Sequence, residues 1–142
     1  MSTPLPGLAA LPVQGGLVSA LVADVPLMAL VTGVLDYATE KHPYPYIRVG
    51  EVIETPDNAH DRHGSQTVAT LHIWSQYRGF AEALTIAARV IQALDHQPLT
   101  VPGHVWRWTR FMSLQTLTDP EPPGDIRHVP MQFRIGTEVD PT

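Results

Sequence analysis

The sequence contains no cysteine, which excludes disulfide bonds, thiolate zinc sites, iron–sulfur clusters and cysteine nucleophiles. Charge is also scarce: charged residues make up 16% of the 142 residues, and 9 Lys plus Arg against 14 Asp plus Glu leave a net charge of -5. That sign is wrong for a protein that holds nucleic acid through its phosphate backbone. The composition therefore disfavours tight nucleic-acid binding.

A long uninterrupted apolar run is missing as well. The longest apolar stretch, Leu17 to Leu35, is interrupted by Asp24, Pro26 and Gly33, so it cannot cross a bilayer as one helix. The first basic residue is Lys41, and a secretory signal with a basic start is therefore not expected. We expect no membrane partner.

Hydrophobic residues, at 44%, supply enough material for one core, and the length suits one domain spanning residues 1–142. Within it we expect an extended N-terminal arm at 1–12, an α+β domain at 13–138 and a C-terminal tail at 139–142. The 14 prolines and 10 glycines are spread along the chain and favour an α+β fold with many turns over a helical bundle.

The clearest periodic pattern lies between Arg78 and His96. Pro98 prevents a helix there from extending further. A shorter helix is expected from Gly16, followed by a second turn that Asp24 caps. In the long helix, apolar residues recur mainly three or four positions apart, as on one buried face: Phe80, Ala83, Leu84, Ala87, Val90, Ile91 and Leu94.

Alternating polar and apolar residues predict strands at 34–37, 46–54, 66–74, 104–117 and 128–137. Gly50 is expected to form a β-bulge that turns Glu51 outward. Pro130 is expected to confine the last strand to an edge or a bulge. The pattern predicts an α+β fold: an antiparallel sheet with one long amphipathic helix packed on it and a short N-terminal helix.

The expected strand 104–117 is apolar on one face and partly apolar on the other. A strand of this kind usually has a layer packed on both sides, and a partner subunit is one candidate for the second layer. The even positions place four apolar side chains on one face: Trp106, Trp108, Met112 and Leu114.

Residues 55–65 contain no Leu, Ile, Val or aromatic residue and predict an exposed loop between two strands of a hairpin. The loop holds imidazole and carboxylate groups, which are legitimate zinc ligands. Their spacing matches no strong motif, so a solvated loop is the favoured interpretation. The residues concerned are Asp57, His60, Asp61 and His63.

The motifs of catalysis are missing too. The sequence has no G-x-S-x-G, no H-E-x-x-H, no dinucleotide glycine pattern and no Walker loop. His72, beside Trp74, is a conceivable base, but a half-buried histidine bonded to a neighbour is the favoured interpretation. We therefore expect no enzyme, no cofactor and no metal.

Aromatic and basic side chains alternate in the expected strand 104–117. Such a pattern can stack bases and pair with phosphates, but the net charge of -5 argues against that role. Arginine is favoured at protein interfaces, so a partner-binding role fits better. The candidate interface residues are Trp106, Arg107, Trp108 and Arg110, together with Asp57, His60, Asp61 and Arg62 of the loop.

Several short motifs share an order and a spacing with one known family. They are Pro43-Tyr44-Pro45-Tyr46-Ile47, Gly50-Glu51, Leu71-His72-Ile73-Trp74-Ser75, the alanine-rich helix from Gly79 to Leu94, Arg127-His128 and Phe133-Arg134. Between Leu17 and Gly136 the sequence thereby resembles the tail completion (tail terminator) proteins of long-tailed bacteriophages.

The resemblance implies a small α+β subunit that forms a hexameric ring and has no catalytic activity. Such a ring caps the head-proximal end of the tail tube, halts tube growth and joins the tail to the head–tail connector. Its partners would be further copies of the chain, the tail tube protein and a connector or stopper protein. It would reside in the virion after assembly in the host cytoplasm, and DNA would slide through an acidic lumen without specific binding.

Three alternatives stay open. The first, in the same class, is another neck component such as a stopper or a head completion protein. The second is a small metal-dependent hydrolase that uses His60, Asp61 and His63, which metal analysis would detect. The third is a host adaptor domain unrelated to virions.

Overall fold

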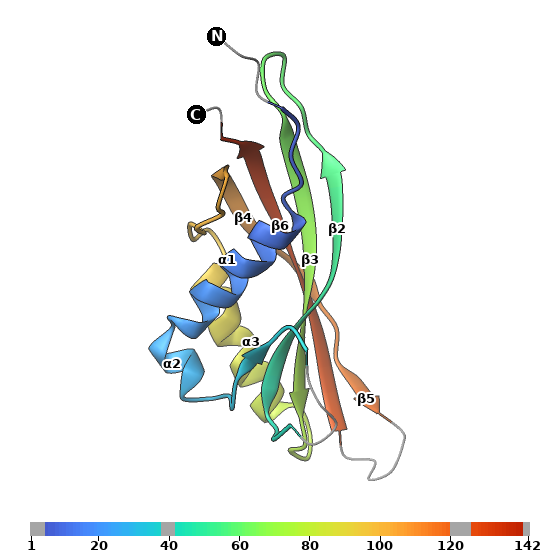
Figure 1. Ribbon diagram of the computed structural model, residues 1–142. Helices are drawn as coiled ribbons and strands as arrows, with labels where there is room; N and C mark the ends of the chain where they lie inside the picture. Colours follow the sequence, from blue (N-terminus) through green and yellow to red (C-terminus); the bar gives the residue numbers. More distant parts are fainter. Residues whose placement is uncertain (1–4, 38–41, 120–125, 141–142) are drawn as a thin grey trace.

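The structure, a computed structural model, describes residues 5–37, 42–119 and 126–140. Figure 1 shows the helices packed on one face of a long, twisted sheet. In chain order the elements are α1 (Ala10–Val22), α2 (Val25–Met28), β1 (Val34–Leu35), β2 (Tyr46–Pro56), β3 (Gly64–Ser75), α3 (Ala81–Leu94), β4 (His104–Leu114), β5 (Leu117–Asp119) and β6 (Ile126–Val139).

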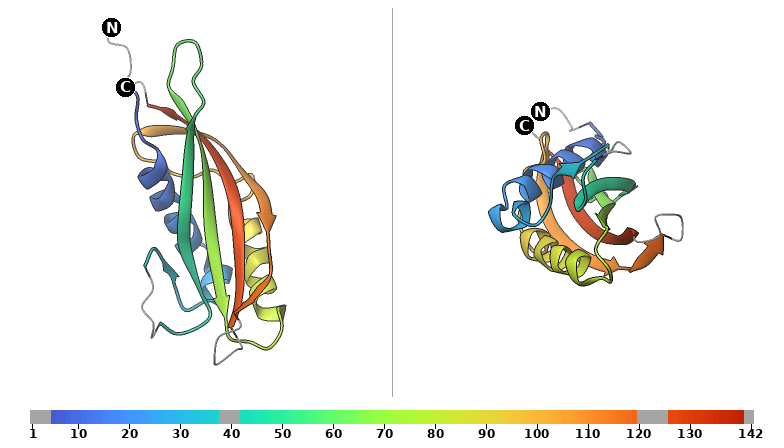
Figure 2. Two further views of the ribbon diagram at one scale, coloured as in Figure 1. Left: turned by 90° about the vertical axis from the view of Figure 1, so that its right-hand side faces the viewer. Right: turned by 90° about the horizontal axis from the view of Figure 1, so that it is seen from below.

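Within the described ranges, six strands form one sheet in the order β1-β2-β3-β6-β4, and β5 also pairs with β6. Every pairing is antiparallel except the short parallel one between β1 and β2. The predicted α+β class, with an antiparallel sheet and one long helix, is confirmed. No described helix covers the opposite face of the sheet (Figure 2).

The hydrophobic core lies between the helices and the sheet. The predicted long helix is confirmed as α3, although it is shorter at both ends than the expected 78–96. Leu84, expected on its buried face, is 39% exposed. The largest fully buried side chains are Val13, Leu17, Leu21, Leu27, Ile47, Leu71, Ile73, Ile86, Leu94, Met131, Phe133 and Ile135.

The N-terminal helix begins earlier than expected. α1 starts at Ala10, so the expected arm at 1–12 is too long, and residues 10–12 are helical. Pro12 fits because the first turn of a helix leaves its amide groups without intrahelical partners. At the other end, β6 runs to Val139, one residue into the expected tail.

The predicted bulge in β2 is confirmed. The register with β3 shifts between Val49 and Val52, where Gly50 lies, and Glu51 is exposed. An extra residue reverses the faces that follow it. Val52 therefore packs against the core, whereas Ile53, which strict alternation would place on the same face as Ile47 and Val49, is 62% exposed.

Pro130 was expected to mark an edge strand or a bulge, and the first of these two alternatives is wrong. β6 lies in the interior of the sheet, between β3 and β4. The proline is tolerated because the neighbouring strand is interrupted between Leu114 and Leu117. There Gln115 N–H donates to the Pro130 carbonyl at 3.1 Å, and no ladder donor is needed from the proline.

Candidate functional site

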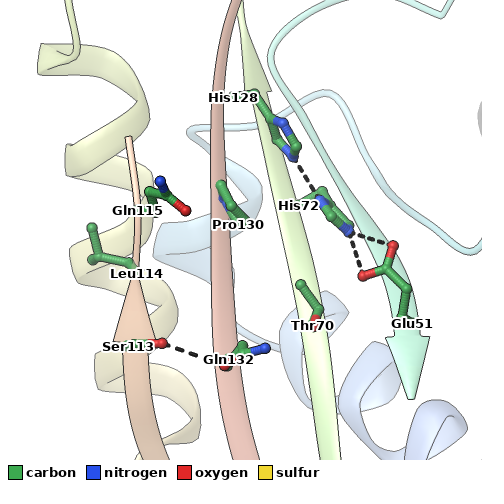
Figure 3. A pocket seen from close by; sticks show the side chains of 9 residues that line it. All are labelled: Glu51, Thr70, His72, Ser113, Leu114, Gln115, His128, Pro130 and Gln132. Carbon is green, nitrogen blue, oxygen red and sulfur yellow. Dashed lines mark hydrogen bonds and ion pairs between the residues drawn. The ribbon is translucent and has the colours of Figure 1, made fainter. Parts of the chain in front are cut away.

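The uncovered face of the sheet carries a stack of three rings from β3 and β6. The rings of Trp74 and His128 lie 3.9 Å apart between centroids and within 7° of parallel. His72 Nδ1 lies 2.6 Å from His128 Nε2, and its ring centroid is 4.8 Å from that of His128. Figure 3 shows both histidines between β2 and β6.

The carboxylate of Glu51 contacts the His72 ring of this stack. His72 Nε2 lies 3.1 Å and 3.2 Å from the two carboxylate oxygens of Glu51. Burial raises the pKa of the Glu51 carboxyl. The hydrogen bond from His72 and the charges of His72 and Arg48 lower that pKa by a larger amount, so the net shift is downward. A side chain on Gly50 would collide with the His72 ring, so this close approach needs glycine.

A cavity of about 570 Å³ opens beside these side chains (Figure 3). Both ring nitrogens of His72 have partners within the protein, as the sequence interpretation favoured. The lining residues are Glu51, Thr70, His72, Ser113, Leu114, Gln115, His128, Pro130 and Gln132.

The structure confirms the predicted hairpin, which β2 and β3 form. The loop residues singled out in the sequence lie at its tip. β2 and β3 extend into the expected loop and leave residues 57–63 as the hairpin tip. Arg62 Nε lies 3.2 Å from Asp61 Oδ1, and Arg62 Nη1 lies 3.1 Å from Glu138 Oε2. Asp57, His60 and Asp61 are exposed.

The tryptophans of β4 do not share a face, contrary to expectation. A register shift between Trp106 and Trp108 reverses the alternation. Trp106 pairs with Thr137, packs against the core and donates from Nε1 to Thr109 Oγ1 at 2.8 Å. Trp108 pairs with Gly136, whose missing side chain makes room for the indole on the uncovered face.

The structure connects the two predicted groups of interface residues through Glu138 of β6. Its carboxylate accepts from Arg62 of the hairpin tip and lies 3.5 Å from Arg107 Nε of β4. Sequence reasoning missed Glu138 and Arg134, although period-two alternation with the buried Phe133 places both on the uncovered face. Arg110 lies opposite Arg134 in the sheet.

In the part of the chain that the structure describes, no three His, Asp or Glu side chains come together as a group that could hold a metal ion. None of the described helices has the length and apolar character needed to cross a membrane.

Comparisons with known proteins identify the family of this chain. A family model described as "Tail completion protein gp17" matches residues 15–138. The chain is 30% identical over 128 residues to the tail completion protein gp17 of Bacillus phage SPP1, and the aligned region covers 90% of this chain and 93% of that protein.

Two solved structures share the fold. A chain in the virion of a native gene transfer agent particle superposes with a TM-score of 0.78 at 25% identity, covering 92% of this chain and 97% of that one. The structure of the bacteriophage SPP1 gp17 protein gives a TM-score of 0.61 at 28% identity, with 96% and 95% covered. The chain therefore belongs to the tail completion protein gp17 family and is a structural component of a phage or phage-like tail.

Proposed function

We propose that the chain is a ring-forming tail terminator. Six copies close into a ring that caps the tail tube, halts its growth and joins it to the head–tail connector. The observation that carries this proposal is an uncovered sheet face, rich in rings and arginines, in a member of the tail completion family. A face of this kind can bind a partner, because aromatic residues and arginine are enriched at protein interfaces.

The sheet edges support lateral assembly. β1 pairs only with Ile47 and Arg48, which leaves the rest of β2 as an open edge among the described residues. On the other side, β4 pairs with no strand but β6 in those ranges, although Asp95 and His96 occupy its edge at Thr109 and Phe111. Open edges bind further strands or chains, and two different edges suit a head-to-tail contact that closes into a ring.

The N-terminal segment offers a second, apolar surface. Leu5, Leu8 and Leu11 are 79%, 71% and 74% exposed, and no charged residue precedes Asp24. Clustered exposed leucines are typical of protein contacts. We assign this surface to packing within the ring or against the tube.

A closed ring presents two different axial faces. One face can match the tube while the other rejects further tube subunits, so growth stops by geometry alone. The acidic chain lets DNA pass without specific binding. Assembly takes place in the host cytoplasm, and the finished ring resides at the head-proximal end of the tail.

Light scattering across a concentration series, with and without the tail tube protein, tests the proposal. We expect a closed multiple near six, either alone or only with the tube protein, because ring interfaces can be marginal in isolation. A strict monomer that ignores the tube protein would overturn it. A ring that binds the connector but not the tube would indicate the alternative, a stopper or head completion protein.

A further inference from the structure

Two arginines face each other on the uncovered side of the sheet. Arg110 of β4 lies directly opposite Arg134 of β6. Like charges in this position repel each other and destabilise the strand pairing. Within the described residues, neither guanidinium forms an ion pair with Asp or Glu, whereas Arg62, Arg89 and Arg107 all do.

Trp108 lies beside these two arginines, and its indole contacts the Arg134 guanidinium. Its indole lies against the backbone of Gly136, where a side chain would collide with it. The Arg134 guanidinium carbon lies 5.5 Å from the centre of the indole ring, and Arg110 Nη1 donates to the Thr109 carbonyl at 3.0 Å. Both guanidinium groups are thus oriented by the protein, as a carboxylate-binding site requires.

The chain itself carries a complementary acidic element. The hairpin tip at 57–63 extends beyond the ends of β4 and β6 (Figures 1 and 2). Asp57 is exposed there, and the Asp61 side chain is 71% exposed although it contacts Arg62. In a head-to-tail ring, the tip of each copy can contact the next copy, and the same contact repeats around the ring.

We propose that Arg110, Arg134 and Trp108, together called the arginine patch, bind the hairpin tip of the neighbouring copy through Asp57 and Asp61. This inference rests on the proposed ring and names its lateral contact. Glu138 contacts Arg62 of the tip and lies on the same strand as Arg134, only four residues after it. The tip and the patch therefore lie toward the same end of the sheet. Rotation about a ring axis does not change the height of a residue along that axis, so a tip and a patch that meet must lie at similar heights.

A nucleic acid is the less suitable occupant. Two arginines neutralise few phosphates, and the net charge of -5 repels a phosphate backbone. An acidic protein segment therefore fits the patch better.

Charge exchange between two variants tests the contact. The patch variant carries Arg110→Glu and Arg134→Glu, and the tip variant carries Asp57→Lys and Asp61→Lys. Each variant alone places like charges across every contact, and we expect its half-assembly concentration to rise at least about tenfold. An equimolar mixture restores opposite charges at every contact in an alternating ring, and we expect assembly to return.

The measurement is light scattering in the presence of the tail tube protein, with Arg78→Glu and Asp36→Lys as matched controls at exposed positions. Circular dichroism and thermal unfolding verify that each variant is folded. Should a reversed variant unfold, the neutral pairs Arg110→Gln with Arg134→Gln and Asp57→Asn with Asp61→Asn replace it. These neutral pairs should weaken assembly less, and high salt should weaken the wild-type ring.

The failures are distinguishable. Wild-type assembly with unaffected variants would overturn the patch and leave the ring proposal standing, whereas a wild-type monomer would overturn both. A mixture that stays unassembled would show that the patch and the tip do not meet. Wild-type protein that retains duplex DNA, with retention lost in the patch variant, would identify nucleic acid as the occupant and refute the proposal.

Discussion

The carboxylate of Glu54 caps the first helix at Ala10, although the two residues belong to different elements far apart in the chain. Glu54 Oε1 accepts from the Ala10 amide at 2.9 Å, and both oxygens accept from the Ala9 amide. α1 has no acidic residue in its first turn and no side-chain cap from Ala9. β2 therefore satisfies the free amides and the positive end of this helix.

Removal of this cap should destabilise the protein. For Glu54→Ala we expect the free energy of unfolding in urea to fall by about 1–2 kcal/mol. Glu54→Gln keeps an acceptor and should lose less. Glu51→Gln is a control in the same strand, where a side chain that is 66% exposed should contribute less than about 1 kcal/mol. Equal stability of Glu54→Ala and the wild type would refute the capping role.

The ion pair between Asp24 and Arg89 should make stability depend on pH. Arg89 Nε and Nη2 donate to the two Asp24 oxygens, each at 2.7 Å, and Leu27 N–H donates at 3.1 Å. The hydrogen bond from Arg89 lowers the pKa of Asp24 below its ordinary value of 3.8; burial opposes this shift, and the Leu27 amide and the Arg89 charge support it.

A pKa lowered in the folded state contributes stability above the unfolded pKa, and that contribution disappears as the pH falls through the folded pKa. Asp24→Asn should therefore be less stable than the wild type at neutral pH, and the difference should vanish below the folded pKa of Asp24. Urea unfolding of both proteins across an acid series measures this, with Asp36→Asn as an exposed control. A difference that persists at the lowest pH would contradict the pair's role.

Two adjacent glycines of α1 should respond oppositely to the same substitution. A side chain on Gly15 meets nothing within 4 Å, so Gly15→Ala should raise the free energy of unfolding by about 0.5–1 kcal/mol. A side chain on Gly16 would lie 2.7 Å from the Thr100 carbonyl oxygen, and Gly16→Ala should lower it by about 1–3 kcal/mol. Thermal unfolding measures both changes, and changes of the same sign would contradict this packing of α1.

The parts of the fold that sequence periodicity predicted are those in which alternation is regular. β3 buries Thr67, Ala69, Leu71 and Ile73, as its pattern indicates, because a strand exposes successive side chains to opposite faces. The errors lie where that alternation breaks. The bulges beside Gly50 and after Trp106 each reverse a face, so Ile53 and Trp108 lie opposite to where the period places them.

The candidate interface divides in the same way. The sequence singled out Arg62, Arg107 and Arg110 from composition and local order alone. It did not identify Glu138 and Arg134, because their roles depend on which strand lies beside β4. Local propensity carries no information on strand order, and Pro130 in an interior strand illustrates that limit.

By itself, the sequence determined the class of fold, the long helix, the hairpin, the absence of thiol chemistry and the resemblance to tail completion proteins. These follow from local periodicity, composition and short motifs. The tertiary structure alone decided that Glu54 caps α1, that His72 lies between Glu51 and His128, and that Arg110 faces Arg134. Such contacts join residues far apart in the chain, and they are set by register and bulges that only the packed sheet defines.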